Sequence, residues 1–378
     1  MKDAGERSGT GPRVLPVGPA GRVAVLGAGG FLGSHLVPAL RRRFGCAVTA
    51  VDVNLDKLEP GDPGVARRLG RIDEPGLIED LVDSSDVVLS LTAICTPAAY
   101  NTQPLEVIAA NYTDLLPVVE ACARKRKWLV HFSTCEVYGR RAISARDGQA
   151  SHTMNERETA LCLGPVENER WSYACAKQLL ERVIFAQGKH RGLPFTMVRP
   201  FNVIGPRMDF VDGIDGEGVP RVLASFLGAL LKEQELLLVE GGQQRRSFIY
   251  VDDFVEGILR LLERPGASLG EIFNLGNPDN DVTIAELAEA LIVAYRTEVG
   301  GPAPQLRAVS AEELYGAGYD DSLERIPDIG KAQERLGFSP RTALGAMLGP
   351  IVRDYVGRYA TRARAGGWVP RAGGGRAA

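Results

Sequence analysis

The chain has 378 residues, of which 45% are hydrophobic and 24% are charged, and its formal net charge is −3. That length supports a large core in one or two domains, and the small net charge gives no general attraction to nucleic acid or anionic membranes. No apolar run reaches the roughly 20 residues that cross a bilayer, and residues 1–20 lack the apolar core of a signal peptide. We therefore expect a cytoplasmic protein with flexible tails at residues 1–20 and 361–378.

The cysteine and histidine content gives no indication of a metal. The six cysteines include no C-x-x-C pair and the chain has only four histidines, so we do not expect a zinc site. Most of the thiols are expected to be small core residues in a reducing compartment.

A glycine-rich turn follows the first strand-like run, at residues 22–26. The turn is Gly27-Ala-Gly-Gly30-Phe-Leu-Gly33, and a helix over 34–44 and a strand over 47–51 that ends at Asp52 come next. This strand–turn–helix–strand unit, with an acid about 20 residues after the turn, is the context of a dinucleotide fingerprint. Asp52 would accept hydrogen bonds from the adenosine ribose and repel a 2′-phosphate. The unit predicts NAD binding, and a chance glycine-rich turn is the competing interpretation.

Another polar run lies at the end of a later strand. Residues 87–92 read as a strand, 104–127 contain a helix, and the strand over 128–132 leads into Ser133-Thr-Cys-Glu-Val-Tyr-Gly139. In an open parallel sheet, ligands bind at the carboxyl ends of the strands. Two hydroxyls, a thiol and a carboxylate at such an end indicate a functional site.

A helix from 171 to about 188 begins with Tyr173 and Lys177, which are four residues apart and lie on one helical face. An ammonium beside a phenol favours the phenolate and lowers its pKa, so Tyr173 could act as a base. Ser133 or Thr134 would hydrogen-bond the same substrate hydroxyl. A pair of surface residues is the alternative interpretation.

Strand and helix patterns continue with strands at 194–198, 235–239 and 272–276 and helices at 219–231, 254–263 and 284–295. They predict an α/β fold: a Rossmann-type doubly wound parallel sheet over residues 21–200, with a later contribution around 245–275. A smaller α/β substrate-binding domain is expected mainly over 201–355. Three arginines in that domain would suit a diphosphate, although solvated surface charge is the alternative for each: Arg221, Arg245 and Arg246.

The order of these motifs resembles the extended short-chain dehydrogenase/reductase family of nucleotide-sugar enzymes. Several runs are similar to the UDP-glucuronate decarboxylases, above all the decarboxylase half of the bifunctional polymyxin-resistance enzyme: Ala93–Pro97, Arg170–Tyr173, Lys177–Arg182, Arg199–Asn202 and Tyr315–Asp321. The resemblance extends from about Val23 to about Arg341.

The resemblance implies NAD as the cofactor, a UDP-sugar as the substrate and a homodimer formed by the helices at 104–126 and 171–188. Its cofactor-binding positions correspond to Gly27, Gly30, Phe31, Leu32, Gly33, Asp52, Thr92, Tyr173 and Lys177. Its substrate-binding positions correspond to Tyr100, Ser133, Asn202, Arg221, Arg246, Tyr319 and Arg325. Its catalytic positions correspond to Tyr173, Lys177, Thr134, Glu136, Cys135 and Arg325.

The mechanism that the resemblance implies begins when Tyr173 removes the proton of the sugar 4-hydroxyl while NAD takes hydride from C4. The C6 carboxylate is then β to a ketone and leaves as carbon dioxide, with Glu136 and Arg325 acting around C5 and C6. The alternative is an epimerase or dehydratase that uses the same 4-keto intermediate, with Cys135 and Glu136 as proton carriers. An NAD-binding regulator without activity is a different class, and it would not need the Tyr173–Lys177 pair.

Two positions depart from the family pattern. Cys135 stands where the decarboxylases have a hydroxyl and the 4,6-dehydratases an aspartate, and the missing aspartate argues against dehydration. A thiol has an ordinary pKa of about 8.5, so Cys135 is either an acid–base group or an isostere of serine. Arg71 replaces an aspartate that touches adenine in the family.

Overall fold

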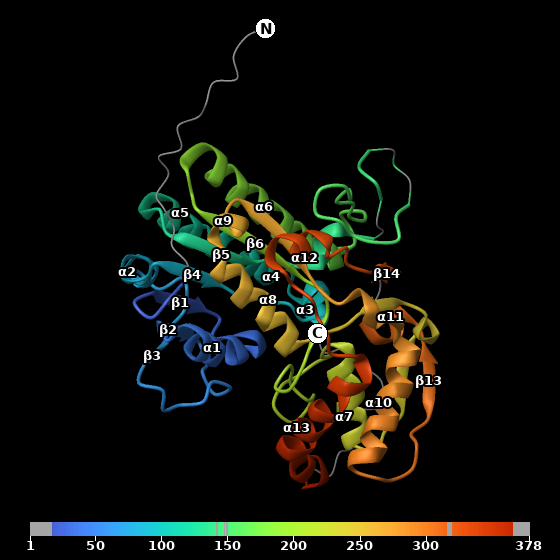
Figure 1. Cartoon of the computed structure of the whole chain (residues 1–378). Helices are drawn as coiled ribbons and strands as arrows, with labels where there is room; N and C mark the ends of the chain where they lie inside the picture. The colour runs from blue at the N-terminus through green and yellow to red at the C-terminus, as the bar shows by residue number, and fades with distance from the viewer. Residues whose placement is uncertain (1–16, 141–142, 147, 149, 316–319, 366–378) are drawn as a thin grey trace, which may run out of the picture.

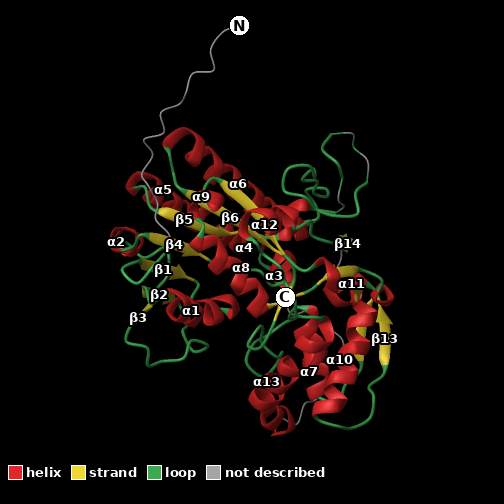
Figure 2. Ribbon diagram, in the orientation of Figure 1, coloured by secondary structure: helices red, strands yellow, loops and turns green. Residues whose placement is uncertain are grey.

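Seven parallel strands form the central sheet of the structure, a computed structural model that describes residues 17–140, 143–146, 148, 150–315 and 320–365. Helices cover both faces of this sheet (Figure 2), which confirms the Rossmann-type fold. In spatial order the strands are β11 (Glu271–Leu275), β6 (Phe195–Pro200), β5 (Trp128–Phe132), β4 (Val87–Ser90), β1 (Arg22–Leu26), β2 (Ala47–Asp52) and β3 (Val65–Leu69).

Alternation along the buried strands gives the sheet two apolar faces, because successive side chains of a strand point in opposite directions. In β1, Val25 packs with α1 (Phe31–Phe44) and α8 (Val251–Glu263). The next residue, Leu26, belongs to the cluster on the other face. That face is covered by α2 (Leu77–Ser84), α5 (Leu116–Lys125) and α6 (Ser172–Arg191).

Two elements of the sheet domain differ from the secondary structure that the sequence predicted. The helix expected within 104–127 is divided into α4 (Pro104–Asn111), the short helix η1 (Thr113–Leu115) and α5. Pro117 lies in the first turn of α5, where its missing N–H costs no hydrogen bond, whereas it would break the interior of a longer helix. The edge strand β3 was not expected, because its residues are largely exposed and include two arginines in place of a buried apolar run.

The C-terminal part forms a second lobe, in the lower half of Figure 1. Its helices are α7 (Val222–Leu231), α10 (Ile284–Glu298) and α13 (Leu344–Ala365). It also contains the strand pair β8 (Leu236–Val239) and β13 (Leu306–Val309), and β9 (Arg245–Ser247) between β12 (Asp281–Thr283) and β14 (Glu324–Arg325). None of the helices within the described residues is both long and apolar enough to span a membrane.

Some residues that the sequence analysis assigned to flexible tails belong to the ordered fold. Residues 361–365 belong to α13, which continues past 360 because Tyr355 and Tyr359 on this helix are buried against the core. At the other end, Val17 is buried and its backbone N–H donates to the carbonyl of Leu262.

A buried ion pair joins α6 to β6. Arg199 donates to both carboxylate oxygens of Glu181, at 2.9 and 2.6 Å, and both side chains are buried. We expect Glu181→Ala to lower the free energy of unfolding by about 3–5 kcal/mol, because it leaves a buried guanidinium without its counter-ion. Urea denaturation measures this loss. Glu263→Ala, which removes a partly exposed partner of Arg43, should cost less than about 1 kcal/mol, and equal losses in the two variants would contradict the prediction.

Candidate active site

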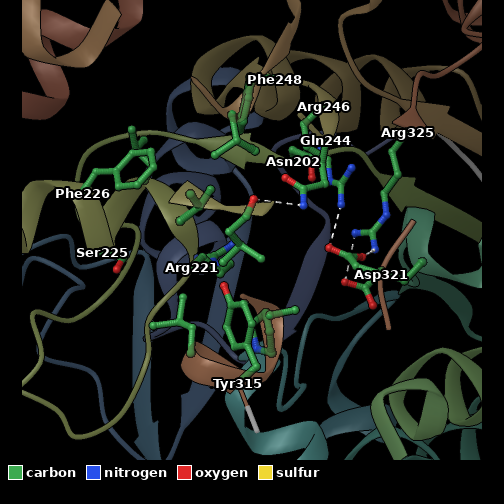
Figure 3. A pocket seen from close by; sticks show the side chains of 18 of the residues that line it. Asn202, Arg221, Ser225, Phe226, Gln244, Arg246, Phe248, Tyr315, Asp321 and Arg325 are labelled. Carbon is green, nitrogen blue, oxygen red and sulfur yellow. Dashed lines mark hydrogen bonds and ion pairs between the residues drawn. The ribbon is translucent and has the colours of Figure 1, made fainter. Parts of the chain in front are cut away.

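A cavity of about 440 Å³ lies where the carboxyl edge of the sheet faces the second lobe. Figure 3 shows side chains from both parts of the chain converging on it. Among the predicted residues, those that line it are Glu136, Asn202, Arg221, Arg246 and Arg325. Glu136 lies in a short helix, η2 (Cys135–Tyr138), whose first turn is capped because the Thr134 hydroxyl accepts the Glu136 N–H at 3.2 Å.

The turn between β1 and α1 has the shape that a dinucleotide requires. Gly27 has a φ of +83°, and a Cβ atom on Gly33 would lie 2.5 Å from the carbonyl oxygens of Gly27 and Ala28, so only glycine fits either position. The amide groups that begin α1 are therefore open to a pyrophosphate. Asp52, at the end of β2, accepts the Gly29 N–H at 2.9 Å and lies beside the turn as the fingerprint predicts. These residues fit NAD.

Three other predicted cofactor residues lie at or beside this turn. Phe31 and Leu32 begin α1, and the buried Thr92 hydroxyl after β4 has no hydrogen-bond partner in the described part of the chain. Arg71, where the family pattern has an aspartate, pairs with Asp73 at the surface at 3.0 Å.

Tyr173 and Lys177 are both buried in the first turns of α6, beside the end of β5. The Lys177 ammonium donates to the carbonyl of Phe132 at 3.0 Å, which fixes it one residue before Ser133. Burial lowers the pKa of Lys177 to about 8. The Ser133 hydroxyl is buried and has no partner among the described residues, so it is available to a substrate hydroxyl.

The pKa of Tyr173 differs from the expectation. Burial raises it well above the ordinary value of a phenol, the nearby Cys95 thiol adds to the rise, and hydrogen bonding with Thr134 opposes it. Lys177 was expected to lower the pKa of Tyr173. Desolvation of the phenol outweighs that effect, because the Lys177 ammonium is directed to the Phe132 carbonyl. Tyr173 therefore keeps its proton in the substrate-free site.

An aromatic stack connects Tyr173 to the charged part of the cavity. The rings of Tyr100 and Tyr173 are nearly parallel, at 7°, with centroids 4.8 Å apart. The guanidinium of Arg170 lies 5.2 Å from the centroid of the Tyr100 ring. This stack fixes the plane of the Tyr173 ring.

Glu136 lies between two arginines. Its carboxylate oxygens pair with Arg170 at 2.5 Å and with Arg325 at 3.2 Å, and all three side chains are buried. Burial alone would raise the pKa of Glu136, but the two guanidiniums outweigh it and the pKa is lowered. Glu136 is therefore ionised, and it orients two cations at the end of β5.

Cys95, Arg170 and Asp321 are among the cavity residues that were not assigned a role from the sequence. Asp321 contacts Arg170, Arg246 and Arg325, and these guanidiniums hold its pKa far below the ordinary value of a carboxyl. Arg170 and Asp321 fall in runs that carry the family resemblance, which was the available signal. Their roles depend on pairings between distant segments that spacing does not reveal.

The remaining predicted residues differ in their surroundings. Arg221 pairs with Asp209 at 3.2 Å at the cavity wall, whereas Arg245 pairs with Asp281 at 2.7 Å and is not among the residues that line the cavity. Burial raises the pKa of Cys135, which keeps this thiol neutral. Tyr319 lies outside the described residues. Within the described ranges, no group of three or more His, Cys, Asp or Glu side chains could hold a metal ion.

Comparison with known sequences gives one family and close relatives. Residues 23–276 match the NAD dependent epimerase/dehydratase family. The UDP-D-apiose/UDP-D-xylose synthase of Oryza sativa subsp. japonica is 45% identical over 352 residues, which cover 88% of this chain and 88% of that protein. The UDP-D-apiose/UDP-D-xylose synthase 1 of Arabidopsis thaliana is 45% identical over 345 residues, which cover 86% of this chain and 89% of that protein.

Solved structures with a similar fold include other proteins that act on nucleotide sugars. The PbgP3 protein from Burkholderia pseudomallei has a TM-score of 0.79 at 33% identity, with 92% of this chain and 99% of that chain covered. The UDP-glucuronic acid 4-epimerase from Bacillus cereus, solved with UDP-glucuronic acid and NAD, has a TM-score of 0.72 with 89% of this chain and 100% of that chain covered. Its 21% identity shows a shared fold only.

Proposed function

Because the chain belongs to the NAD dependent epimerase/dehydratase family, we propose that this NAD-dependent enzyme oxidises UDP-glucuronate at C4 and decarboxylates the product to a UDP-pentose. The observation that carries the proposal is the Arg170–Glu136–Arg325 arrangement beside Tyr173 and Ser133. It offers two buried guanidiniums to a sugar carboxylate, and the Tyr100 ring links one of them, Arg170, to the catalytic phenol. The names of the two plant relatives, which contain UDP-xylose, support the same class of product.

The oxidation step depends on Tyr173. NAD, when bound, accepts the hydride from C4, and the positive charge of its ring lowers the pKa of the neighbouring phenol. Tyr173 then takes the proton of the 4-hydroxyl, while Ser133 and Thr134 hold that hydroxyl by hydrogen bonds. The fixed Lys177 and the Tyr100 stack keep the phenol in position.

Carbon dioxide leaves in the next step. The C6 carboxylate is β to the new C4 ketone, so the electrons of the C5–C6 bond move onto the ketone oxygen as that bond breaks. Tyr173, now protonated, donates a hydrogen bond to this oxygen, and C5 afterwards takes up a proton. Arg170 and Arg325 orient the carboxylate, and the ionised Glu136 keeps them apart.

Both sugars in the names of the plant relatives contain five carbons, so either one requires the loss of one carbon from a hexuronate. Xylose has an unbranched skeleton and apiose a branched one. A branched skeleton additionally requires a C–C bond of the 4-keto sugar to break and re-form. The proposal therefore includes both pentoses as products of one 4-keto intermediate.

A substrate panel read by mass spectrometry tests the function. With added NAD, UDP-glucuronate should lose one carbon dioxide and give a UDP-pentose, while UDP-glucose remains unchanged. An unchanged hexuronate mass with an altered sugar configuration would favour an epimerase, and loss of water from a neutral hexose would favour a dehydratase. NAD binding without any product would favour a regulator.

We also place a dimer interface on α4 and α6, which pack side by side. Together they expose four large apolar side chains: Leu105, Ile108, Leu179 and Phe185. Such a face is typical of an interface.

A cytoplasmic location is supported by the six cysteines, which form no disulfide.

Leu179→Glu tests the dimer, because a carboxylate buried in an apolar contact is not compensated. The parent should have the mass of two chains in light scattering after gel filtration, and the variant the mass of one. Val293→Glu is the matched control, because it changes another exposed apolar residue, on α10, and it should leave the mass unchanged. A parent of one chain's mass would contradict the proposal.

A further inference from the structure

Asp320, at the wall of the cavity, joins two segments that are far apart in the chain. One oxygen of its carboxylate accepts the indole N–H of Trp171 at 3.1 Å and the side-chain amide of Asn168 at 3.4 Å. The same oxygen lies 3.2 Å from the guanidinium of Arg140. Trp171 and Asn168 lead into α6, which carries Tyr173, whereas Asp320 leads into β14. These contacts therefore attach a segment of the second lobe to the beginning of α6.

Gly164 lies directly against the hydrogen bond between Trp171 and Asp320. A Cβ atom on Gly164 would lie 2.4 Å from the indole Nε1 and 3.0 Å from the accepting oxygen of Asp320. Gly164 is not in the left-handed region of φ, so the close approach alone requires a glycine here. The Trp171 side chain is buried, and a buried N–H without an acceptor is costly. Donor, acceptor and the missing side chain together specify this one hydrogen bond.

Each end of the hydrogen bond lies next to a residue of the proposed carboxylate site. Trp171 follows Arg170, whose guanidinium lies 5.3 Å from the centroid of the indole ring. Asp320 precedes Asp321, which pairs with Arg325 at 2.6 Å (Figure 3). The indole ring therefore supports one guanidinium, and its N–H fixes the segment that orients the other.

We propose that Trp171 is a positioning residue. Its hydrogen bond to Asp320 holds the guanidiniums of Arg170 and Arg325 in the arrangement that binds the sugar carboxylate. This rests on the proposed function, and it adds a residue that touches neither the substrate nor the cofactor.

The two steps of the reaction should respond differently when this hydrogen bond is lost. A displacement of about 1 Å can lower a rate about a hundredfold, so looser guanidiniums should slow the release of carbon dioxide. Oxidation at C4 depends on Tyr173, whose ring is held by the stack with Tyr100 and not by this hydrogen bond. It should therefore persist.

Three substitutions remove the hydrogen bond in different ways. Trp171→Phe keeps an aromatic ring without the donor, Asp320→Leu removes the acceptor at similar size, and Gly164→Ala places a methyl group against the indole nitrogen. Asp320→Asn keeps a carbonyl oxygen as the acceptor and is the conservative variant. Trp128→Phe is the matched control, because the Trp128 indole donates to the Thr196 hydroxyl at the same 3.1 Å and does not line the cavity.

We expect the first three variants to release carbon dioxide about tenfold more slowly than the parent, with NADH formation in the first turnover within about twofold of the parent. Asp320→Asn and Trp128→Phe should release carbon dioxide at the rate of the parent. Combining Trp171→Phe with Asp320→Leu should add no further loss, because both substitutions remove the same hydrogen bond. Equal slowing of both steps, or additive losses in the double variant, would overturn the proposal.

A binding measurement separates this proposal from the proposed function. The NAD-loaded proteins are titrated by calorimetry with UDP-glucuronate and with UDP-xylose, which lacks the carboxylate. The preference for UDP-glucuronate should fall about tenfold in Trp171→Phe and remain that of the parent in Trp128→Phe. An unchanged preference in Trp171→Phe would overturn the proposal. If the parent releases no carbon dioxide, the proposed function fails, while the binding preference still decides the role of Trp171, because it requires no chemistry.

Discussion

Replacing Tyr173 with phenylalanine is expected to lower kcat by about a thousandfold or more, because no other group takes the proton of the 4-hydroxyl. The substitution removes one oxygen and keeps the ring that stacks on Tyr100. NAD binding should therefore be retained. Appearance of NADH absorbance in a single turnover measures the oxidation, and calorimetric titration with NAD measures binding.

Tyr112→Phe serves as the control, because this partly buried tyrosine packs in the apolar cluster under α2, α5 and α6 and is not among the residues that line the cavity. Its activity should equal that of the parent. A Tyr173→Phe variant that is as active as the parent would show that the assigned base is wrong.

The second large effect is expected for Glu136→Gln. The variant loses the negative charge between Arg170 and Arg325, so both guanidiniums attract the sugar carboxylate more strongly, while both keep their contacts with Asp321. Release of carbon dioxide should slow about a hundredfold or more, since stronger attraction stabilises the starting carboxylate more than the transition state in which its charge moves away. Hydride transfer uses other residues and should persist, so NADH should form in the first turnover without a pentose.

The same substitution should lower the free energy of unfolding by about 3–5 kcal/mol, because it breaks a buried charge network. Circular dichroism therefore accompanies the kinetic assay, and the activity is compared only for folded protein. Equal slowing of NADH formation and carbon dioxide release would contradict a role confined to the second step.

The order of the elements was readable from the sequence because each strand of the sheet interior is a short apolar run. Trp128–Phe132 and Phe195–Pro200 are examples, and each is followed by a polar residue that lines the cavity, Glu136 after the first and Asn202 after the second. The division of α4 from α5 was hidden because the apolar spacing continues through Pro117. The exposed edge strand β3 lacks apolar alternation, and only its pairing with β2 makes it a strand.

The candidate site was partly predictable for a similar reason. Tyr173 and Lys177 carry a local spacing, and Ser133 to Glu136 follow a strand, so sequence alone indicates them. Asp321 acts through contacts with Arg170 and Arg246, which are 151 and 75 residues away in the chain. No local pattern marks such pairs. The pKa of Tyr173 also depends on burial, which raises it against the expected effect of Lys177.

The central claim concerns the fate of the sugar carboxylate, and one measurement follows it directly. The purified protein is incubated with NAD and UDP-glucuronate carrying carbon-13 at C6, and the gas and the nucleotide sugar are analysed together by mass spectrometry. We expect labelled carbon dioxide in the gas and an unlabelled UDP-pentose, in equal amounts. Labelled carbon retained in a UDP-hexuronate, with no labelled gas, would contradict the assignment of this site to decarboxylation.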